Sequence, residues 1–215
     1  MSNLQTILNL SSSWHKHLCP RQVLGARIGL AGAAALGLEG PRQDKRLLAI
    51  VETDGCFSSG VEAATACSVR HRTLRVADYG KIAATFVDVK TGTAVRIAPQ
   101  LDVRQKALAY APEEKKHYFA QLVGYQRMPD DELLAVQPVR LTTPIDEIVS
   151  RAGVRANCAA CGEEIINERE VERDGRVYCR GCVGPAYYEP DTLVFMPRGT
   201  AVPPIPNITI IPTKI

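Results

Sequence analysis

Four cysteines near the C-terminus constrain the fold of this chain more than any other feature. Their spacing is C-x2-C-x17-C-x2-C, and they are Cys158, Cys161, Cys179 and Cys182. Each C-x2-C pair can place two thiolates on one side of an ion through a tight turn, and two such pairs complete a tetrahedron. Two disulfides, or four unrelated thiols, are the alternative, which a chain without secretory features disfavours. The sequence therefore predicts a module built around one Zn²⁺.

The segment between the cysteine pairs predicts a β-hairpin. Residues 169–172 and 176–178 have strand character and are joined by Asp174-Gly175, a strong turn signal. A knuckle, a hairpin and a second ligand pair in this order suit a treble-clef or ribbon zinc finger, which we expect over residues 155–189. Acidic and basic residues balance in this segment, whereas phosphate binding needs an excess of Lys and Arg. We expect a structural or protein-contacting finger, with nucleic acid a disfavoured partner.

Size and composition allow a full hydrophobic core in addition to the finger. The 215 residues are 46% hydrophobic and 23% charged, as in ordinary globular domains. We expect a core domain over residues 1–150. After the finger we expect an extended tail over residues 190–215, where repeated prolines disfavour helix.

Charge and hydropathy argue against nucleic-acid and membrane partners. The formal net charge of +3 is too small to indicate either. The longest uncharged apolar stretch near the start covers residues 28–38, well short of the roughly 20 residues that span a bilayer. With no recognisable signal peptide, we expect a cytoplasmic protein without membrane association. Its seven cysteines would then be ligands or free thiols rather than disulfides.

The core domain is predicted to be α+β, an antiparallel sheet with packed helices. Cys19-Pro20 marks the start of one helix, and a capping box at residues 59–62 places the start of a second near Gly60. Helices are expected over residues 21–38 and 60–69, and a helical segment over 101–125 that Pro112 interrupts. Strands are expected over 47–52, in a meander within 74–98 and at an edge over 136–141, followed by a linker over 142–156. A stripe of small residues on the first helix, here called the small-residue seam, comprises Gly25, Gly29, Gly32 and Ala33. It allows close approach of another helix, and packing within the chain is its usual role. It also suggests a surface that a second chain completes in a dimer.

A second cluster of candidate ligands lies before the first of these helices. His15, His17 and Cys19 occupy alternate positions, and Cys56 lies between a strand and the second helix. Both thiols would lie near a helix N-terminus, which stabilises thiolate and lowers the thiol pKa. If the fold gathers these four residues, they form a mixed imidazole and thiolate site for zinc or another borderline-soft metal. From composition alone, a surface histidine pair with two buried cysteines is an equal alternative.

Four separated stretches resemble the formylmethanofuran dehydrogenase E-subunit (FmdE) family, in the same order and at similar intervals. They are WHKHLCP at 14–20, ETDGCF at 52–57, TACS at 65–68 and LRVADYGK at 74–81, and the similarity covers roughly residues 10–150. The resemblance implies an α+β core, a dimer, and a core site that uses His17, Cys19 and Cys56, with Cys67 nearby. The finger resembles the auxiliary treble clef of some members. Members are named for their link to a molybdenum or tungsten enzyme of one-carbon metabolism, and the family name supplies no reaction.

The chain departs from the family pattern beside this site. In the family pattern a glycine follows the Cys-Pro pair and another precedes the third cysteine, which is Cys67 here. This chain has Arg21 and Ala66 at those two positions, and VRHR at 69–72 replaces a Gly-rich segment. Arg21, Arg70, His71 and Arg72 could give the cleft an anion-binding character. Solvated charges at a helix end are the alternative, because most arginines are exposed.

Three functions follow from these features. We favour a zinc-binding FmdE-like protein, with a second metal in the core, accessory to a molybdenum or tungsten formylmethanofuran dehydrogenase-type system or related one-carbon metabolism. The second is an enzyme with Cys19 or Cys56 as thiolate, His17 as base and Lys81 or Arg70 orienting a small anionic substrate. The third, a zinc-finger regulatory or nucleic-acid-binding protein, is disfavoured by the balanced charge of the finger. The sequence leaves open whether the protein is an enzyme, and we expect a homodimer, with a further protein partner through the finger or the tail.

Overall fold

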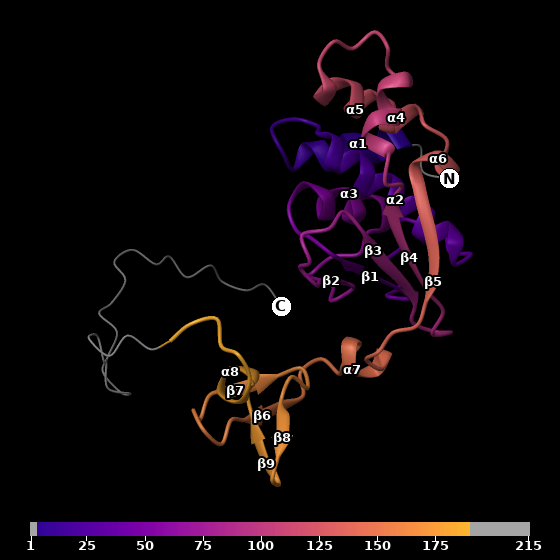
Figure 1. Ribbon diagram of the computed structural model, residues 1–215. Coiled ribbons are helices and arrows are strands. Elements are labelled where there is room, and N and C mark those ends of the chain that lie inside the picture. The colour runs from indigo at the N-terminus through magenta and orange to yellow at the C-terminus, as the bar shows by residue number, and fades with distance from the viewer. Residues whose placement is uncertain (1–3, 190–215) are drawn as a thin grey trace, which may run out of the picture. The chain divides into compact units, whose positions relative to one another are not determined.

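The computed structural model describes residues 4–189 (Figure 1). The chain separates into two compact units, with the division between Ser150 and Arg151. The predicted Pro-rich tail at 190–215 lies outside the described residues. Among residues 4–189, no helix has the length and apolar character needed to cross a membrane.

The first unit is α+β, as predicted. Its elements in chain order are α1 Leu4–Ser13, α2 Pro20–Ala35, β1 Leu47–Val51, α3 Cys56–Thr65, β2 Leu74–Val76, β3 Ala84–Asp88, β4 Ala94–Pro99, α4 Val103–Ala109, α5 His117–Arg127, α6 Asp130–Leu133, β5 Leu134–Val139 and α7 Ile145–Val149. Helix α1 was not predicted, and α7 lies within the segment expected to be a linker. Prediction placed α2 correctly, because Pro20 is suited to a first helical position and Cys19 has the extended backbone of an N-cap.

The five strands form one sheet in the order β2-β1-β3-β4-β5. Strands β1, β3, β4 and β5 pair antiparallel, and β5 is an edge strand, as its Pro138 predicts. The expectation of a meander is wrong for β2, which pairs parallel to β1 with Ala49 opposite Leu74. Helix α3 makes the crossover between β1 and β2, and a crossover is what parallel neighbours require.

Strand β1 divides its side chains between two hydrophobic clusters, because successive residues of a strand point to opposite faces. Leu47, Ala49 and Val51 join the main core, which also contains buried residues of α1, α2 and α3. Leu48 lies in a smaller cluster with Val87 and Ala94, against which partly buried residues of α7 pack. The larger core therefore lies on the side of the sheet that the first three helices cover (Figure 1), and α7 packs against part of the other face.

The small-residue seam of α2 packs inside the same chain. A Cβ added at Gly25 would lie 2.2 Å from the Phe57 carbonyl oxygen, and one at Gly29 would lie 2.7 Å from the Ala64 Cβ. A Cβ at Gly32 would lie 2.1 Å from the ring of Phe86. Helix α3 and β3 therefore fill the seam, which is not a surface left open for a second chain. The idea that the seam completes a dimer is thus incorrect.

Helix α3 begins four residues earlier than predicted. Its first residue is Cys56, and Gly55 precedes it with a φ of 68°, which a glycine adopts without strain. The Oγ of Ser58 donates to the Gly55 carbonyl at 2.8 Å inside this first turn. The helix ends when Ala66 enters the left-handed region at φ 60°, so Cys67 lies beyond the helix instead of within it.

Over residues 151–189, the second unit forms two short hairpins and one helical turn. Its elements are β6 Arg155–Asn157, β7 Glu164–Ile166, β8 Val171–Arg173, β9 Arg176–Tyr178 and α8 Arg180–Val183. Strands β8 and β9 pair antiparallel around the predicted Asp174-Gly175 turn, where both residues have positive φ. Among the described residues of this unit, Cys158 and Ile165 are the buried apolar side chains. Such a core is too small to stabilise a fold by hydrophobic burial alone.

Candidate functional sites

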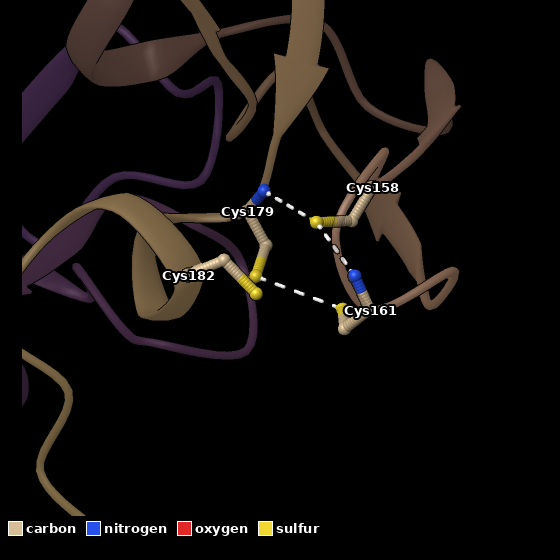
Figure 2. Close-up of side chains that lie close together, drawn as sticks. All are labelled: Cys158, Cys161, Cys179 and Cys182. Carbon is tan, nitrogen blue, oxygen red and sulfur yellow. Dashed lines mark hydrogen bonds between the residues drawn. The ribbon is translucent and has the colours of Figure 1, made fainter.

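The finger brings its four cysteine side chains together, as Figure 2 shows. Cys158 and Cys161 come from the turn between β6 and β7, Cys179 follows β9, and Cys182 lies in α8. All four Sγ atoms lie within 4.8 Å of one another, and those of Cys161 and Cys179 are 4.0 Å apart. A tetrahedron with Zn–S bonds of about 2.3 Å has S–S edges of nearly this length. The group could therefore bind one metal ion.

Two backbone amides donate to the sulfur of Cys158, the first ligand. The Sγ of Cys158 accepts from the amides of Cys161 at 3.5 Å and Cys179 at 3.3 Å. The amide of Gly162 donates to the Cys158 carbonyl at 2.8 Å, and Gly162 has a φ of 76°, which closes the turn. Amide donors directed at sulfur stabilise thiolate and orient it toward a shared centre.

The four thiols do not ionise equally. Hydrogen bonds from the amides of Cys161 and Cys179 lower the pKa of Cys158 to about 6. The pKa of Cys182 is raised to about 12, first because it shares a hydrogen bond with Cys179 and then because of Cys158 and Cys161. One thiolate thus forms readily near neutral pH, whereas several thiolates this close together need a cation to offset their repulsion.

The core unit holds a cleft of about 660 Å³. The side chains that matter for its chemistry are His17, Cys19, Arg21, Cys56, Arg104 and Tyr118, and they come from α2, α3, α4, α5 and the segment before α2. This is the size of an ordinary small-molecule site. We call it the core cleft.

The core cleft brings Cys19 and Cys56 side by side. Burial raises the pKa of Cys56, and a hydrogen bond with Cys19 raises it further. The pKa of Tyr118 is also raised, mainly by burial and then by the charges of Cys19 and Cys56, which places the phenol beside both thiols. The prediction that a helix N-terminus would lower the pKa is therefore wrong for Cys56, because desolvation outweighs the helix dipole.

The two histidines of the cluster make different contacts. His17 lines the core cleft with the two cysteines. His15 instead places its Nε2 3.0 Å from the Oγ of Ser59 on α3. Among residues 4–189, the four finger cysteines are the only group of three or more His, Cys, Asp or Glu side chains whose ligand atoms meet within 4.8 Å. A metal in the core cleft would therefore draw His17 toward the thiol pair.

Cys67 and Lys81 lie outside the lining of the core cleft. Cys67 is 1% exposed, donates to the Leu47 carbonyl at 3.3 Å, and has a pKa raised by burial. Lys81 is exposed, and its backbone amide donates to the Glu52 carbonyl. These positions give Cys67 a packing role and leave Lys81 at the surface.

Only one of the predicted anion-binding residues reaches the core cleft. Arg21 lines it, whereas Arg70 and His71 are exposed elsewhere and Arg72 donates to the Val149 carbonyl at 2.7 Å. Sequence reasoning missed Arg104, Tyr118 and Gln121, which lie on α4 and α5 and complete the cleft wall. No local pattern distinguished them from the solvated face of a helix.

A family model described as "FmdE, Molybdenum formylmethanofuran dehydrogenase operon" matches residues 14–135. That is more than half of the chain. The chain belongs to the FmdE family. The matched region contains every residue that lines the core cleft, whereas the finger cysteines lie beyond it.

A solved structure and a second protein are also similar to this FmdE-family chain. A crystal structure of a tungsten formylmethanofuran dehydrogenase FmdE-like protein from Syntrophus aciditrophicus matches with a TM-score of 0.57 and 20% identity, covering 87% of this chain and 96% of that one. This likeness shows a shared fold. A protein of Archaeoglobus fulgidus named "Probable S-adenosyl-L-methionine-binding protein" is 26% identical over 207 residues. The match covers 86% of this chain and 55% of the relative, so the chain spans about half of that protein's length.

Proposed function

We propose that this protein is a zinc-binding FmdE-family protein that holds one zinc in the finger and a second metal in the core cleft. The observation that carries the proposal is the convergence of Cys158, Cys161, Cys179 and Cys182. A set of four thiolates suits a soft or borderline ion such as Zn²⁺ and leaves no position open for substrate. The finger metal is thus structural.

The core cleft suits a different kind of metal site. Cys19 and Cys56 would supply two thiolates, and His17 would supply an imidazole from the same cleft. Three protein ligands leave a position for water or substrate, as in catalytic zinc sites. A metal held there would act as a Lewis acid, while the protein side chains position the ligand and limit solvent access. His15, bonded to Ser59, is a possible fourth ligand only if that contact breaks.

We assign the protein a supporting role in a molybdenum or tungsten enzyme system of formylmethanofuran dehydrogenase type, or in related one-carbon metabolism. Family membership over residues 14–135 supports this assignment. The protein partner would bind through the finger or the tail. A tagged chain purified from its own cells should then carry a molybdenum- or tungsten-containing enzyme with it. Recovery of the tagged chain without any such enzyme would argue against the accessory role.

Metal analysis of protein purified without added metal tests the two-metal proposal. We expect about two ions per chain, because the finger and the core cleft have separate ligand sets. One ion per chain, lost on mutation of a finger cysteine, would leave the core cleft without a metal. The alternative with Cys56 as a free nucleophile would then gain weight, although the raised pKa of this thiol disfavours it.

A second candidate is binding of S-adenosyl-L-methionine, which the name of the Archaeoglobus fulgidus relative assigns to that protein. The observation that favours it is a core cleft of about 660 Å³ with two arginines and two tyrosines in its wall. Calorimetric titration of the full chain with this ligand tests it directly. Binding that survives mutation of cleft residues would place the ligand elsewhere.

A further inference from the structure

The core cleft has a strongly one-sided charge. Arg21 and Arg104 line it, and no aspartate or glutamate among residues 4–189 does. Arg21 lies close enough to Cys56 for its charge to act on the thiol, and Arg104 likewise acts on Tyr125. Two cations in the wall of a concave, partly enclosed site concentrate a positive potential inside it.

Neither arginine has a partner among the described residues. Arg21 and Arg104 form no ion pair and no side-chain hydrogen bond within residues 4–189. Other arginines of the unit are paired, as Arg27 is with Asp130 and Arg96 with Glu52. Exposed arginines are often merely solvated, but two unpaired guanidinium groups in one cleft are available to bind an anion.

The rest of the wall indicates what carries the anion. Tyr118 and Tyr125 present aromatic rings, and Leu24 and Ile82 present aliphatic surface. The side chain of Gln121 adds a neutral donor and acceptor in the same wall. A wall that combines aromatic and aliphatic surface with polar groups suits a small organic molecule that has both an apolar and a polar part. A bare inorganic ion would leave these apolar surfaces without a contact.

We propose that the core cleft binds a small organic anion, a carboxylate or phosphate on a flat apolar body, with Arg21 and Arg104 as its anion-binding groups. The guanidinium groups hold the anionic end by charge-assisted hydrogen bonds. The apolar body lies against Tyr118, in the same cleft as Cys19 and Cys56. The inference rests on the proposed function, because it names the ligand class of the same cleft.

The test uses the full, metal-loaded chain and three probes: benzoate, phenyl phosphate and the neutral benzamide. Calorimetry should show binding of the anions and much weaker binding of benzamide, and the preferred anion identifies the class as carboxylate or phosphate. Arg21→Gln and Arg104→Gln should each weaken anion binding by about tenfold, the effect of losing one charge-assisted hydrogen bond. Arg70→Gln removes the same charge at an exposed position outside the cleft, and affinity should be unchanged.

Three results would overturn the inference. They are equal binding of benzamide and benzoate, equal weakening by Arg70→Gln, and no binding of either anion up to about 10 mM, a concentration that detects even weak affinity. Metal content measured on the same samples separates this inference from the proposed function. If Cys56→Ser keeps both metals while the arginine variants lose anion binding, the proposed core metal fails and the anion site stands. If Cys56→Ser loses a metal while the arginine variants bind as wild type, the anion site alone fails.

Discussion

At the scale of single residues, Cys56 and Cys67 show how position decides the role of a thiol. Cys56 is half-buried in the core cleft beside Cys19, whereas Cys67 is fully buried and donates to a backbone carbonyl. The two residues lie in neighbouring family motifs and have the same chemistry. Cys56 is a candidate metal ligand because it lines the core cleft, and Cys67 is a packing residue because it does not.

Changing Cys56 to Ser should lower the metal content by about one ion per chain and leave the finger loaded. The loss of a ligand from a site with few protein ligands weakens binding severely, because the remaining groups cannot complete the coordination. Metal analysis of the purified variant measures this. Cys67→Ser is the control and should keep both ions. The opposite pattern would mean that the two roles are inverted, and no change in either variant would mean that the core cleft is not a metal site.

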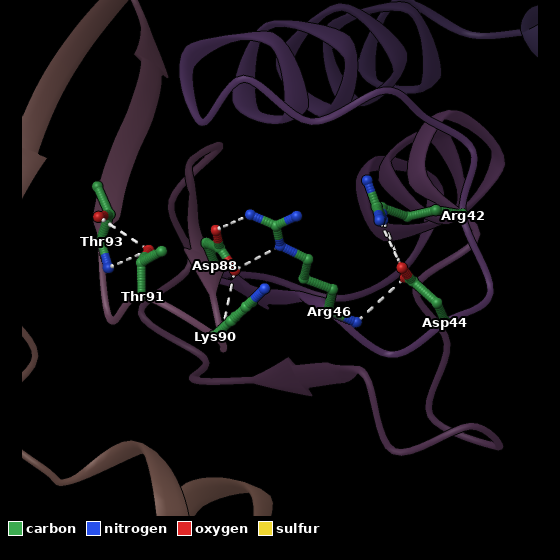
Figure 3. A network of polar contacts seen from close by, with 7 residues as sticks. All are labelled: Arg42, Asp44, Arg46, Asp88, Lys90, Thr91 and Thr93. Atoms are coloured by element: carbon green, nitrogen blue, oxygen red, sulfur yellow. Dashed lines mark hydrogen bonds and ion pairs between the residues drawn. The ribbon is translucent and has the colours of Figure 1, made fainter.

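Asp88 belongs to a polar network that closes the hairpin of β3 and β4, as Figure 3 shows. Arg46 donates to its two carboxylate oxygens at 3.0 and 2.7 Å, and the amide of Lys90 donates at 3.0 Å. The Arg46 guanidinium, followed by the Lys90 amide, holds the pKa of Asp88 at about 2, below its usual range. A lowered pKa contributes stability that is present above the unfolded pKa, near 4, and lost as pH falls toward 2.

Asp88→Asn should therefore reduce the free energy of unfolding at pH 7 by about 1–2 kcal/mol, a value reduced because Arg46 is partly exposed. The difference from wild type should shrink as the pH falls from about 4 to about 2, since wild-type Asp88 protonates there. Urea unfolding at several pH values measures both effects. Asp44→Asn is the control: its pKa is also about 2, but its carboxylate is half-exposed in a pair with Arg42, so solvent screens the interaction. An equal loss of unfolding free energy in Asp88→Asn and Asp44→Asn would contradict the expectation that burial strengthens the Arg46–Asp88 pair.

At the scale of elements, α2 organises the first unit. Its small-residue seam receives α3 and the ring of Phe86, and its N-terminus faces the core cleft through Cys19 and Pro20. Arg27, also on α2, donates to the carbonyls of Tyr125 and Met128 at 2.7 Å and so fixes the end of α5. One helix thus positions both thiols of the cleft and the wall that faces them.

The finger is an element-scale unit whose stability should come from metal. It buries Cys158 and Ile165 and little other apolar surface among its described residues, so hydrophobic burial alone cannot hold it. A fragment of residues 151–190 should be unfolded without metal and should fold when zinc is added. Circular dichroism during a zinc titration measures this, and a fragment with Cys161 and Cys182 changed to Ser is the control. A fragment that is folded before zinc is added, or unchanged after it, would contradict the four-thiolate site.

At the scale of the whole molecule, we propose that the chain forms a dimer, on the basis of the family resemblance alone. The small-residue seam no longer supports it, because α3 fills that surface. Multi-angle light scattering should give twice the mass of 23.4 kDa over a wide range of concentration. A monomer mass throughout would remove the proposal.

The sequence by itself determined the features that depend on neighbours along the chain. The four-cysteine spacing predicted the metal group, Cys19-Pro20 predicted the start of α2, and Asp174-Gly175 predicted the β8–β9 turn. Each is a short-range geometric constraint, so local residue chemistry was enough to specify it. Family motifs added His17, Cys19 and Cys56, which line one cleft.

Only the tertiary structure decided the features that depend on distant residues. Arg104 and Tyr118 reach the core cleft from α4 and α5, far along the chain from Cys19, and nothing local marks them. The parallel pairing of β2 follows from the crossover through α3, and the raised pKa of Cys56 follows from burial by neighbouring elements. Pairing partners and desolvation are properties of packing, so a pattern of residues along the chain cannot specify them.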